Sequence, residues 1–344
     1  MRRPRSAPAG RSSRAATALE DLTPLADAAL ARRAALLADP QTTVGRLVHA
    51  HADGIDGLVV EKLGDVLVVH LYEGQLRLSE TAARQVCEHV ARRVGAAAVY
   101  RKLYPKDRST VSRDLEQRHR DSQPWIGAPV QAELAVREHG LTFLVRPYDG
   151  YLTGLFLDHR LSRRRVRELA AGRRVLNTFA YTCAFTVAAA LGGARETVSV
   201  DIARKFLEWG KRNLAANGLG LEQHRFICSD VFDYYRRAAR QGEHFDFVIL
   251  DPPTFARQKG RRQTFVLAQD LEQLVAGVLP LLERDGLIHL SVNHRGTSRR
   301  RLQEAVAAAA AVQGRRCQWL EAAPLPEDFC GDAEFAKSIL VRVP

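Results

Sequence analysis

The second half of the chain predicts a doubly wound, Rossmann-like α/β fold, and two observations carry this prediction. Short apolar runs alternate with segments of helical pattern, and the runs lie at 174–177, 197–201, 225–228, 247–251 and 287–292. Single helices between strands imply right-handed βαβ units in a parallel sheet. The second observation is that Asp201 and Asp251 close two of these runs and Asp230 closes or follows a third. Open sheets of this kind bind ligands at the carboxyl ends of their strands.

The first half predicts a small α+β domain in front of that sheet. Strands are expected at 45–49, 57–62, 66–71, 98–101 and 140–145, with a turn at Gly64 and Asp65 and a helix over about 78–94. We therefore divide the chain into a basic disordered arm plus a helix (1–40, the helix at 25–38), a small α+β domain (41–146) and a sheet domain (147–344).

Composition limits the classes of function. The chain has 344 residues, 46% of them hydrophobic, which suits about two folded domains. No apolar run approaches the roughly 18 residues that cross a bilayer, and the basic start lacks the apolar core of a secretory signal. The five cysteines show no metal-ligand spacing with histidines, so we expect no metal and no disulfide framework, and a reducing cytoplasm. The net charge of +12 favours a polyanionic partner, although an arginine-rich proteome gives the same charge.

The strand-end aspartates predict a nucleoside site. Asp201 lies 201 − 177 = 24 residues after Asn177, near the spacing of about 20 at which a doubly wound fold places a carboxylate against a ribose. A single aspartate here is more often a helix cap, but three in succession favour a ligand. The first loop, from Asn177 to Phe185, lacks GxGxxG, which argues against a dinucleotide and a nicotinamide-dependent oxidoreductase. A ligand with a ribose and a base but no phosphate, such as S-adenosylmethionine, fits better.

Five motifs carry a resemblance to a known family. They are HADGIDGL (51–58), TGLFLDHR (153–160), LNTFAYT (176–182), SVD (199–201) and DPPTF (251–255). With them, residues from about 43 onward resemble the class I, S-adenosylmethionine-dependent methyltransferases of 23S ribosomal RNA of the large subunit, which have guanine-N7 and cytosine-C5 branches. The resemblance implies a seven-stranded methyltransferase sheet, S-adenosylmethionine as cofactor and RNA as partner.

The resemblance also implies roles for individual residues. Asn177, Phe179 and Tyr181 line the methionine end, Asp201 holds the ribose, and Asp230 faces the adenine. Phe156, Asp158 and Arg160 close the site from below. The implied cofactor-binding set is Phe156, Asp158, Arg160, Asn177, Phe179, Tyr181, Asp201, Ile202, Asp230, Val231 and Asp251.

Three departures from the family pattern stand out. Relatives commonly carry two glycines where this chain has Cys183 and Ala184. A non-glycine residue at a position that needs a positive φ costs about 1 kcal/mol or more, which would weaken cofactor binding. Gln-Lys is replaced by Tyr151 and Leu152, and the small RNA-binding module that precedes the core in the cytosine branch is expected to be missing.

The target atom depends on whether a thiol reaches the substrate base. Methylation at C5 of a pyrimidine needs a covalent nucleophile, yet 251–255 and 291–296 contain no cysteine. Cys228 and Cys317 are expected in the core, Cys183 is expected to act as a small side chain, and Cys330 stays open. We therefore favour a ring nitrogen, as at guanine N7, which needs only alignment. The predicted catalytic set is Asp251, Pro252, Pro253, Phe255 and Asn293.

Two basic clusters flank this predicted base slot. They are expected to contact RNA phosphates, and their members are Arg257, Lys259, Arg261, Arg262, Arg295, Arg299 and Arg300. A solvated charged face is the alternative, and Arg163 to Arg165 fit a helix surface equally well. Cytosine-C5 methylation and a noncatalytic RNA-binding relative stay open as alternative functions, and the sequence leaves the oligomeric state undetermined.

Overall fold

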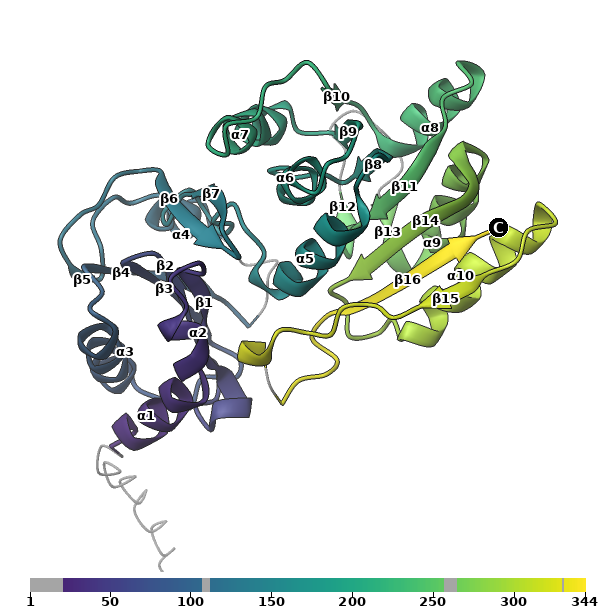
Figure 1. Ribbon diagram of the computed structural model, residues 1–344. Coiled ribbons are helices and arrows are strands. Elements are labelled where there is room, and N and C mark those ends of the chain that lie inside the picture. Colours follow the sequence, from purple (N-terminus) through teal and green to yellow (C-terminus); the bar gives the residue numbers. More distant parts are fainter. Residues whose placement is uncertain (1–20, 107–111, 257–264, 330) are drawn as a thin grey trace, which may run out of the picture.

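The computed structural model describes residues 21–106, 112–256, 265–329 and 331–344, which form two lobes around two sheets (Figure 1). The first sheet has the order β1-β2-β3-β4-β5. Its strands are β1 (Val44–His49), β2 (Leu58–Leu63), β3 (Val66–Tyr72), β4 (Ala98–Tyr104) and β5 (Ile126–Gly127). The predicted turn at Gly64 and Asp65 joins β2 to β3, since Leu63 pairs with Val66.

Two helices cover one face of this first sheet. α3 (Glu80–Val94) begins at Ser79, whose side chain accepts a hydrogen bond from the Ala82 N–H, and α1 (Thr23–Arg32) packs beside it. The sequence predicted a single helix at 25–38, but the structure has two. α1 ends at Arg32, and α2 (Ala34–Ala38) begins after Arg33. The Arg33 side chain is buried, and its guanidinium donates to Asp53 and to the backbone oxygens of Arg46 and Asp328.

The second sheet has seven strands in the order β10-β9-β8-β11-β14-β16-β15. They are β8 (Arg174–Thr178), β9 (Glu196–Asp201), β10 (His224–Cys228), β11 (Phe245–Leu250), β14 (Leu282–Val292), β15 (Gln318–Leu320) and β16 (Lys337–Val343). The first five strands along the chain run parallel and β16 is antiparallel to β14. The predicted doubly wound, seven-stranded fold is confirmed, and all five expected strands are present.

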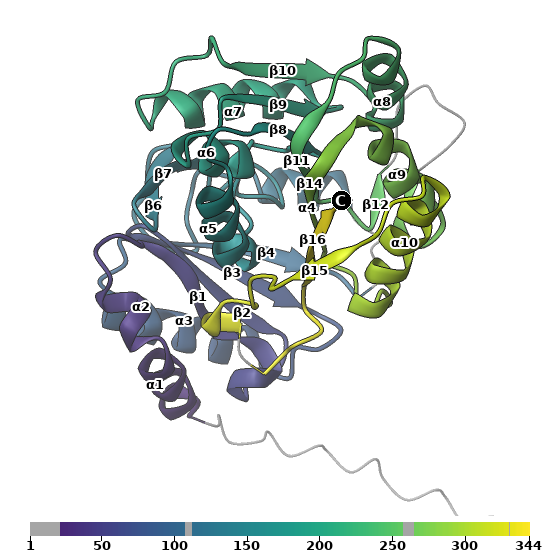
Figure 2. The same ribbon diagram turned by 45° about the vertical axis from the view of Figure 1, so that its right-hand side comes forward.

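Helices cover both faces of this second sheet (Figures 1 and 2). α5 (Arg160–Leu169), α6 (Ala184–Leu191) and α7 (Arg204–Ala215) lie on one face, and α8 (Val231–Arg240), α9 (Leu267–Val278) and α10 (Arg299–Val312) on the other. Alternate residues of β11 enter opposite cores: Phe247 and Ile249 face α5 and α6, while Val248 and Leu250 face α8 to α10. A strand buried on both faces explains the continuous apolar run in the sequence.

A hairpin connects the two sheets. β6 (Leu134–Glu138) and β7 (Leu141–Val145) pair only with each other, so the expected strand at 140–145 is present but lies outside the first sheet. Val136 and Phe143 of the hairpin share one core with Val68 of the first sheet and with Val187 of α6. The boundary placed at 146 stays a prediction, because this core is continuous across it.

Buried arginines of α5 reinforce that connection. Arg163 forms two hydrogen bonds of 2.7 Å with Glu138 of β6, and Arg160 forms bonds of 2.5 and 3.1 Å with Asp328 in η5 (Glu327–Phe329). Arg163 is therefore structural, whereas Arg164 and Arg165 are on the helix surface beside Glu168. Among the described helices, none is both long and apolar enough to cross a membrane.

We expect His289→Leu to reduce the acid sensitivity of the fold. His289 is buried in β14, and burial lowers its pKa from 6.5 to about 3. The unfolded chain therefore binds a proton first, so the free energy of unfolding falls as the pH drops from about 6.5 to about 3. The replacement should remove up to about 1.4 kcal/mol per pH unit of this slope.

Urea unfolding between about pH 7 and pH 5 measures the slope. His244→Gln is the control, because the His244 side chain is exposed and forms no ion pair with the described residues. Equal slopes for His289→Leu and the unaltered chain would contradict the prediction.

Candidate active site

The carboxyl ends of five parallel strands form the candidate site. After β8 the chain passes outward to β9 and β10 and then returns to β11 on the other side of β8, so the strand order reverses between β8 and β11. Doubly wound folds bind ligands in the crevice at such a reversal. The edge carries, in spatial order, Asp230 after β10, Asp201 in β9, the loop after β8, Asp251 after β11 and Asn293 after β14.

The loop after β8 has an unusual backbone. Three of its residues that are not glycine have positive φ angles: Phe179 (52°), Tyr181 (49°) and Cys183 (61°). Each such residue carries a local energetic cost, and residues of this kind concentrate at ligand sites. Cys183 and Ala184 stand at the two positions where the resemblance led us to expect glycine. Cys183 does adopt the left-handed conformation, whereas Ala184 is the first residue of α6.

The Asp201 carboxylate holds this loop in place. Its two oxygens accept the backbone N–H groups of Tyr181 and Ala203, each at 2.8 Å. Burial raises the pKa of Asp201, and these backbone N–H groups oppose that rise. Ile202 directly follows and is 48% exposed, so an acceptor and an apolar surface stand side by side. Such a pair suits the ribose and base of a nucleoside.

Asp230 caps the start of a helix, as the alternative interpretation of a strand-end aspartate predicted. Its side chain accepts the N–H of Asp233 at 3.1 Å, at the start of α8, where Val231 is buried. A carboxylate has further acceptor sites, so the capping bond leaves the predicted role at adenine possible.

The residues expected at the methionine end lie in or beside the loop after β8. Asn177 is buried, its amide donates to Thr186 at 2.9 Å, and its side-chain oxygen has no partner among the described residues. The Tyr181 ring is packed between Phe156, at 5.3 Å, and Phe206, at 4.5 Å between ring centroids. The Phe179 ring instead faces Phe265, at 5.4 Å.

A network of polar side chains surrounds Asp251. The Ser291 hydroxyl donates to Asp251 Oδ1 at 2.6 Å, and His159 Nε2 lies 3.4 Å from the same oxygen. Asp158 belongs to the same network, because the Asn293 amide donates to it at 3.3 Å. Burial raises the pKa of Asp251, while His159 and Ser291 oppose the rise. Asp251 Oδ2 receives no hydrogen bond from the described residues, so it can accept one from a ligand.

His159 and Ser291 are site residues that sequence reasoning missed. His159 lies in η3 (Leu157–His159), inside the quoted TGLFLDHR motif, and Ser291 is two residues before the predicted Asn293. Ser291 is a polar residue within the apolar run of a predicted strand, which was an available signal, whereas His159 stands between Asp158 and Arg160 and is not set apart by its neighbours. Only the fold shows that both face Asp251.

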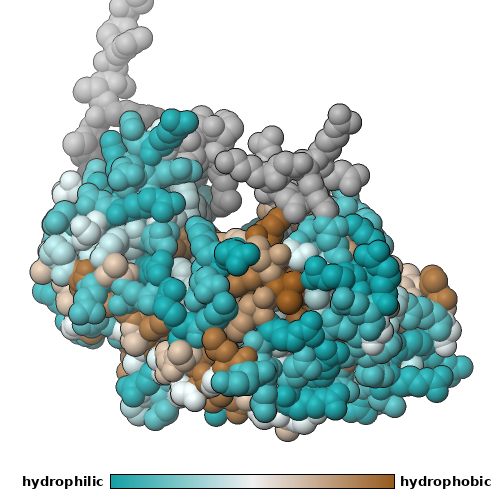
Figure 3. Space-filling model, turned by 90° about the horizontal axis from the view of Figure 1, so that it is seen from above, coloured by the Kyte–Doolittle hydropathy of each residue, from teal (hydrophilic) through white to brown (hydrophobic). Residues whose placement is uncertain are grey.

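The lip after β11 presents an aromatic ring. Pro252 is buried, Pro253 is exposed and Phe255 is 61% exposed. After the lip, β12 (Phe255–Ala256) and β13 (Phe265–Val266) pair as a short hairpin before α9, an element that the alternation of strands and helices did not predict. Figure 3 shows a recess between the two lobes with hydrophobic side chains exposed inside it.

Arg160 is placed differently from the expectation that it closes the cofactor site. It is 5% exposed and its guanidinium is used by Asp328, which also accepts the backbone N–H of Arg46. Arg160 thereby fixes the α5 helix that follows Asp158 and His159, and its expected role at the cofactor stays a prediction.

The cysteine positions give one correction. Cys228 is exposed at the end of β10, so its expected place in the core is wrong. It is three strands from β11 in the sheet order, about 14 Å, which is too far to attack a base held at Asp251. Cys183 is fully buried, and burial raises the pKa of its thiol to about 12. Cys317 is half-buried, and Cys330 is outside the described residues.

The structure describes only some of the basic residues that were predicted to contact RNA. Arg257, Lys259, Arg261 and Arg262 lie outside the described residues. Arg295 pairs with Asp332 and Arg300 with Glu304, while Arg299 is exposed. Arg295 and Arg300 line a groove of about 510 Å³ between α9 and α10. The groove adjoins the lip, because the Leu267 N–H donates to the Thr254 oxygen.

Comparisons with known proteins agree with this geometry. A profile of the S-adenosylmethionine-dependent methyltransferase family matches residues 46–340. The ribosomal RNA large subunit methyltransferase of Deinococcus radiodurans is 35% identical over 335 residues, covering 92% of this chain and 78% of the relative. Ribosomal RNA large subunit methyltransferase K of Neisseria meningitidis serogroup B is 42% identical over 164 residues, covering 47% of this chain and 46% of the relative, less than half of either.

A solved structure gives the same fold. SMU.776, described as a candidate methyltransferase and complexed with S-adenosylhomocysteine, superposes with a TM-score of 0.80 at 27% identity. The superposition covers 96% of this chain and 83% of that one.

We expect Gly210→Ala to distort the loop after β8. A Cβ atom at Gly210 of α7 would lie 2.4 Å from Cys183 Sγ, so the loop must move. The free energy of unfolding should fall by about 1–3 kcal/mol, and S-adenosylhomocysteine should bind more weakly. Adding Cys183→Gly removes the collision and the strained φ, so the double variant should recover most of both losses.

Thermal unfolding and calorimetric titration with S-adenosylhomocysteine measure the two effects. Gly242→Ala is the control, because Gly242 has a positive φ that strains an alanine, whereas no atom lies within 4 Å of the added Cβ. It should lower stability and leave ligand binding intact. Additive losses in the double variant would contradict the proposed contact.

Proposed function

The chain belongs to the family of S-adenosylmethionine-dependent methyltransferases, and from this premise we propose that it methylates a base of large-subunit ribosomal RNA. The preferred target is a ring nitrogen, as at guanine N7. The support is that an exposed aromatic ring and an acceptor with a free oxygen flank the cofactor loop, while no described cysteine is within reach of them. We further propose a cytoplasmic location, where ribosomal RNA is accessible.

The strand ends fit the cofactor. Asp201 would accept hydrogen bonds from the ribose hydroxyls, and Ile202 would pack against the adenine, with Asp230 as acceptor for its amino group. The unpartnered oxygen of Asn177 fits the methionine ammonium group. Phe156 and Tyr181 would close the methionine end. When bound, S-adenosylmethionine supplies an electrophilic methyl group on a sulfonium sulfur.

The lip would hold the substrate base beside that methyl group. Phe255 would stack on the base, and Asp251 Oδ2 would accept a base N–H. Pro252 and Pro253 restrict the backbone between these two side chains, so the pair is preorganised. Asn293 lies across the lip, where the Thr254 hydroxyl donates to its backbone oxygen at 3.2 Å.

Guanine N7 carries no proton, so none has to be removed before it attacks. Guanine N7 has a free lone pair, and its methylation leaves a positive charge on the ring. A carboxylate in a partly buried position stabilises such a charge as it develops. Ser291 and His159 favour the ionised form of Asp251 that this role requires.

The cytosine-C5 alternative needs a thiolate. Cys183 is buried with a raised pKa, and Cys228 lies three strands away. Cys317 precedes Gln318, which is level with Leu287 across the sheet and so lies toward the amino end of β14, away from the lip. Cys330 alone is not placed. The second candidate therefore depends on a single residue and can be tested through it.

RNA phosphates would follow the groove between α9 and α10. Arg295, Arg300 and Arg301 line it beside the lip, although each is paired with a carboxylate. These carboxylates would weaken the nonspecific attraction of the groove for RNA. The main contribution of the groove would then be to position the RNA backbone.

The function is tested by transfer of a labelled methyl group from S-adenosylmethionine to large-subunit ribosomal RNA, followed by digestion and mass spectrometry of the nucleosides. We expect a methylated purine ring nitrogen and unchanged transfer in Cys228→Ala and Cys330→Ala. Labelled 5-methylcytidine that disappears in Cys330→Ala would establish the C5 alternative. Binding of S-adenosylhomocysteine with no transfer to RNA would indicate a noncatalytic relative.

We expect Asp251→Asn to lower the rate of methyl transfer by about 10²- to 10³-fold, because it removes charge at unchanged shape. Binding of S-adenosylhomocysteine should change little. In the unaltered enzyme, activity should fall with decreasing pH at a midpoint above the ordinary aspartate value, since the pKa of Asp251 is raised and the protonated form lacks the charge.

The pH profile of single-turnover transfer measures this midpoint. Asp246→Asn is the matched control, because Asp246 is on the same strand and interacts with Arg195 on the opposite edge of the sheet from the site. Full activity in Asp251→Asn would exclude the proposed electrostatic role.

A further inference from the structure

Among the described residues, the outer edge of β4 (Ala98–Tyr104) is open in one place. β4 pairs with β3 along its whole length, from Ala98 to Tyr104, but with β5 only at Ala98 and Val99. Beyond Val99, two other groups use this edge. The Trp125 N–H donates to the Val99 oxygen at 2.8 Å, and the Leu103 N–H donates to His119 Nε2 at 2.9 Å.

Arg101 lies midway between Val99 and Leu103, the two residues of β4 that make these contacts. In an extended strand, the N–H and C=O groups of alternate residues point to the same side. Because Val99 and Leu103 use the outer edge, the backbone N–H and C=O of Arg101 must also face outward. A donor and an acceptor therefore stand side by side at this position.

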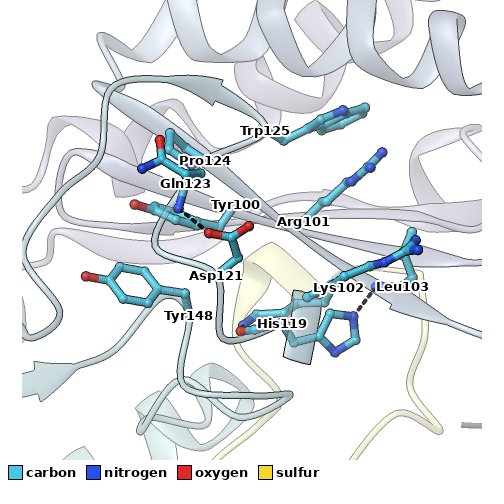
Figure 4. Close-up of a pocket in the computed structure, with 11 residues that line it drawn as sticks. Tyr100, Arg101, Lys102, Leu103, His119, Asp121, Gln123, Pro124, Trp125 and Tyr148 are labelled. Carbon is cyan, nitrogen blue, oxygen red and sulfur yellow. Dashed lines mark hydrogen bonds between the residues drawn. The ribbon is translucent and has the colours of Figure 1, made fainter. Parts of the chain in front are cut away.

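A cavity of about 270 Å³ covers that position (Figure 4). Its wall includes Trp125, whose ring centroid is 5.1 Å from the Arg101 guanidinium, and the rings of Tyr100 and Tyr148, 5.0 Å apart. Both tyrosine hydroxyls are held by backbone oxygens, of Ser122 at 2.9 Å and of Val130 at 3.0 Å. The aromatic walls are therefore fixed in place before any ligand binds.

The floor of the cavity is also fixed. Lys102 is 1% exposed, and its ammonium donates to the backbone oxygens of His119 and Gly150. Burial, with a contribution from Lys102, lowers the pKa of His119 to about 4, so its neutral ring can accept the Leu103 N–H at neutral pH. The open position at Arg101 is thus bounded by the backbone contact of Trp125 on one side and by His119 on the other.

Two polar side chains and one cation complete the lining. Asp121 Oδ1 accepts the Gln123 N–H at 2.9 Å, which orients its carboxylate (Figure 4). Arg118 also lines the cavity and is exposed. Cavities that bind small ligands are usually about 300–1,000 Å³, so this one suits a single planar group with a phosphate outside it.

We propose that this cavity binds one unpaired nucleotide of the RNA substrate. The base hydrogen-bonds the Arg101 backbone and packs against Trp125, Asp121 accepts an exocyclic amino group, and Arg118 faces the phosphate. The inference rests on the proposed function for its choice of RNA. Every base has a donor and an acceptor side by side on its pairing edge, and base pairing hides both, so the cavity selects an unpaired nucleotide.

The edge geometry argues against a peptide. Addition of a β-strand requires a row of open backbone groups, whereas in the described part of the chain only Arg101 is open between the contacts of Trp125 and His119. Uracil lacks an exocyclic amino group and would leave Asp121 without a partner. The cavity should therefore prefer adenine, cytosine or guanine to uracil.

Fluorescence anisotropy with fluorescein-labelled hexaadenylate and hexauridylate RNA tests the proposal on the full chain. Trp125→Ala should weaken binding of hexaadenylate about tenfold or more, and Trp125→Phe should restore most of it. Trp319→Ala is the matched control, because Trp319 is 40% exposed on β15, away from the cavity. Equal affinity of Trp125→Ala and the unaltered chain, or equal affinity for the two RNAs, would overturn the proposal.

Two further readouts separate this site from neighbouring hypotheses. The first is competition with adenosine monophosphate. If it displaces hexaadenylate at equal concentration, the cavity binds a free nucleotide, and the assignment to RNA is overturned. In methyl transfer, Trp125→Ala should raise KM for ribosomal RNA and leave kcat and S-adenosylhomocysteine binding unchanged. Failure of the proposed function would abolish transfer in every variant, while the anisotropy measurement would still report on the cavity.

Discussion

The buried pairing of Arg160 with Asp328 is the interaction on which the arrangement of the two lobes depends. Asp328 also accepts the Arg46 backbone N–H of the first sheet, and its own backbone oxygen accepts the Arg33 guanidinium. Removing one partner of such a pair leaves an uncompensated buried charge, at a cost of about 3–5 kcal/mol. Together with the pair of Arg163 and Glu138, this pairing fixes α5 against the first sheet and the connecting hairpin.

The position of α5 matters to the site because η3 leads into it. Asp158 and His159 reach Asn293 and Asp251 only if η3 stays where α5 holds it. On the proposed function, the charge state of the base-holding carboxylate therefore depends on arginines that contact neither cofactor nor RNA. Asp201 has a similar double role, since the carboxylate expected at the ribose also holds a loop with three positive φ angles.

If the proposals hold, RNA is contacted at both lobes. The lip and the groove of α9 and α10 would position the target nucleotide, and the cavity at Arg101 would hold a second, unpaired one. Contacts to phosphates add affinity without selectivity, whereas backbone groups that require an unpaired base add selectivity for RNA shape. The shared core around Val136 and Phe143 would keep the two contacts at a fixed separation.

The sequence by itself determined the features that depend on local chemistry. Alternating apolar runs predicted five strands of the second sheet, and the aspartates that close those runs were correctly expected at one edge, because parallel strands end on the same side. The missing phosphate loop and the motifs excluded a dinucleotide and indicated the family. Tertiary structure alone decided that Cys228 is exposed, that Arg160 is used by Asp328, that β6 and β7 form a separate hairpin, and that His159 faces Asp251. Arg160 and Asp328 are 168 residues apart, and a pairing at that separation leaves no periodic signal, since it arises only when distant segments pack together.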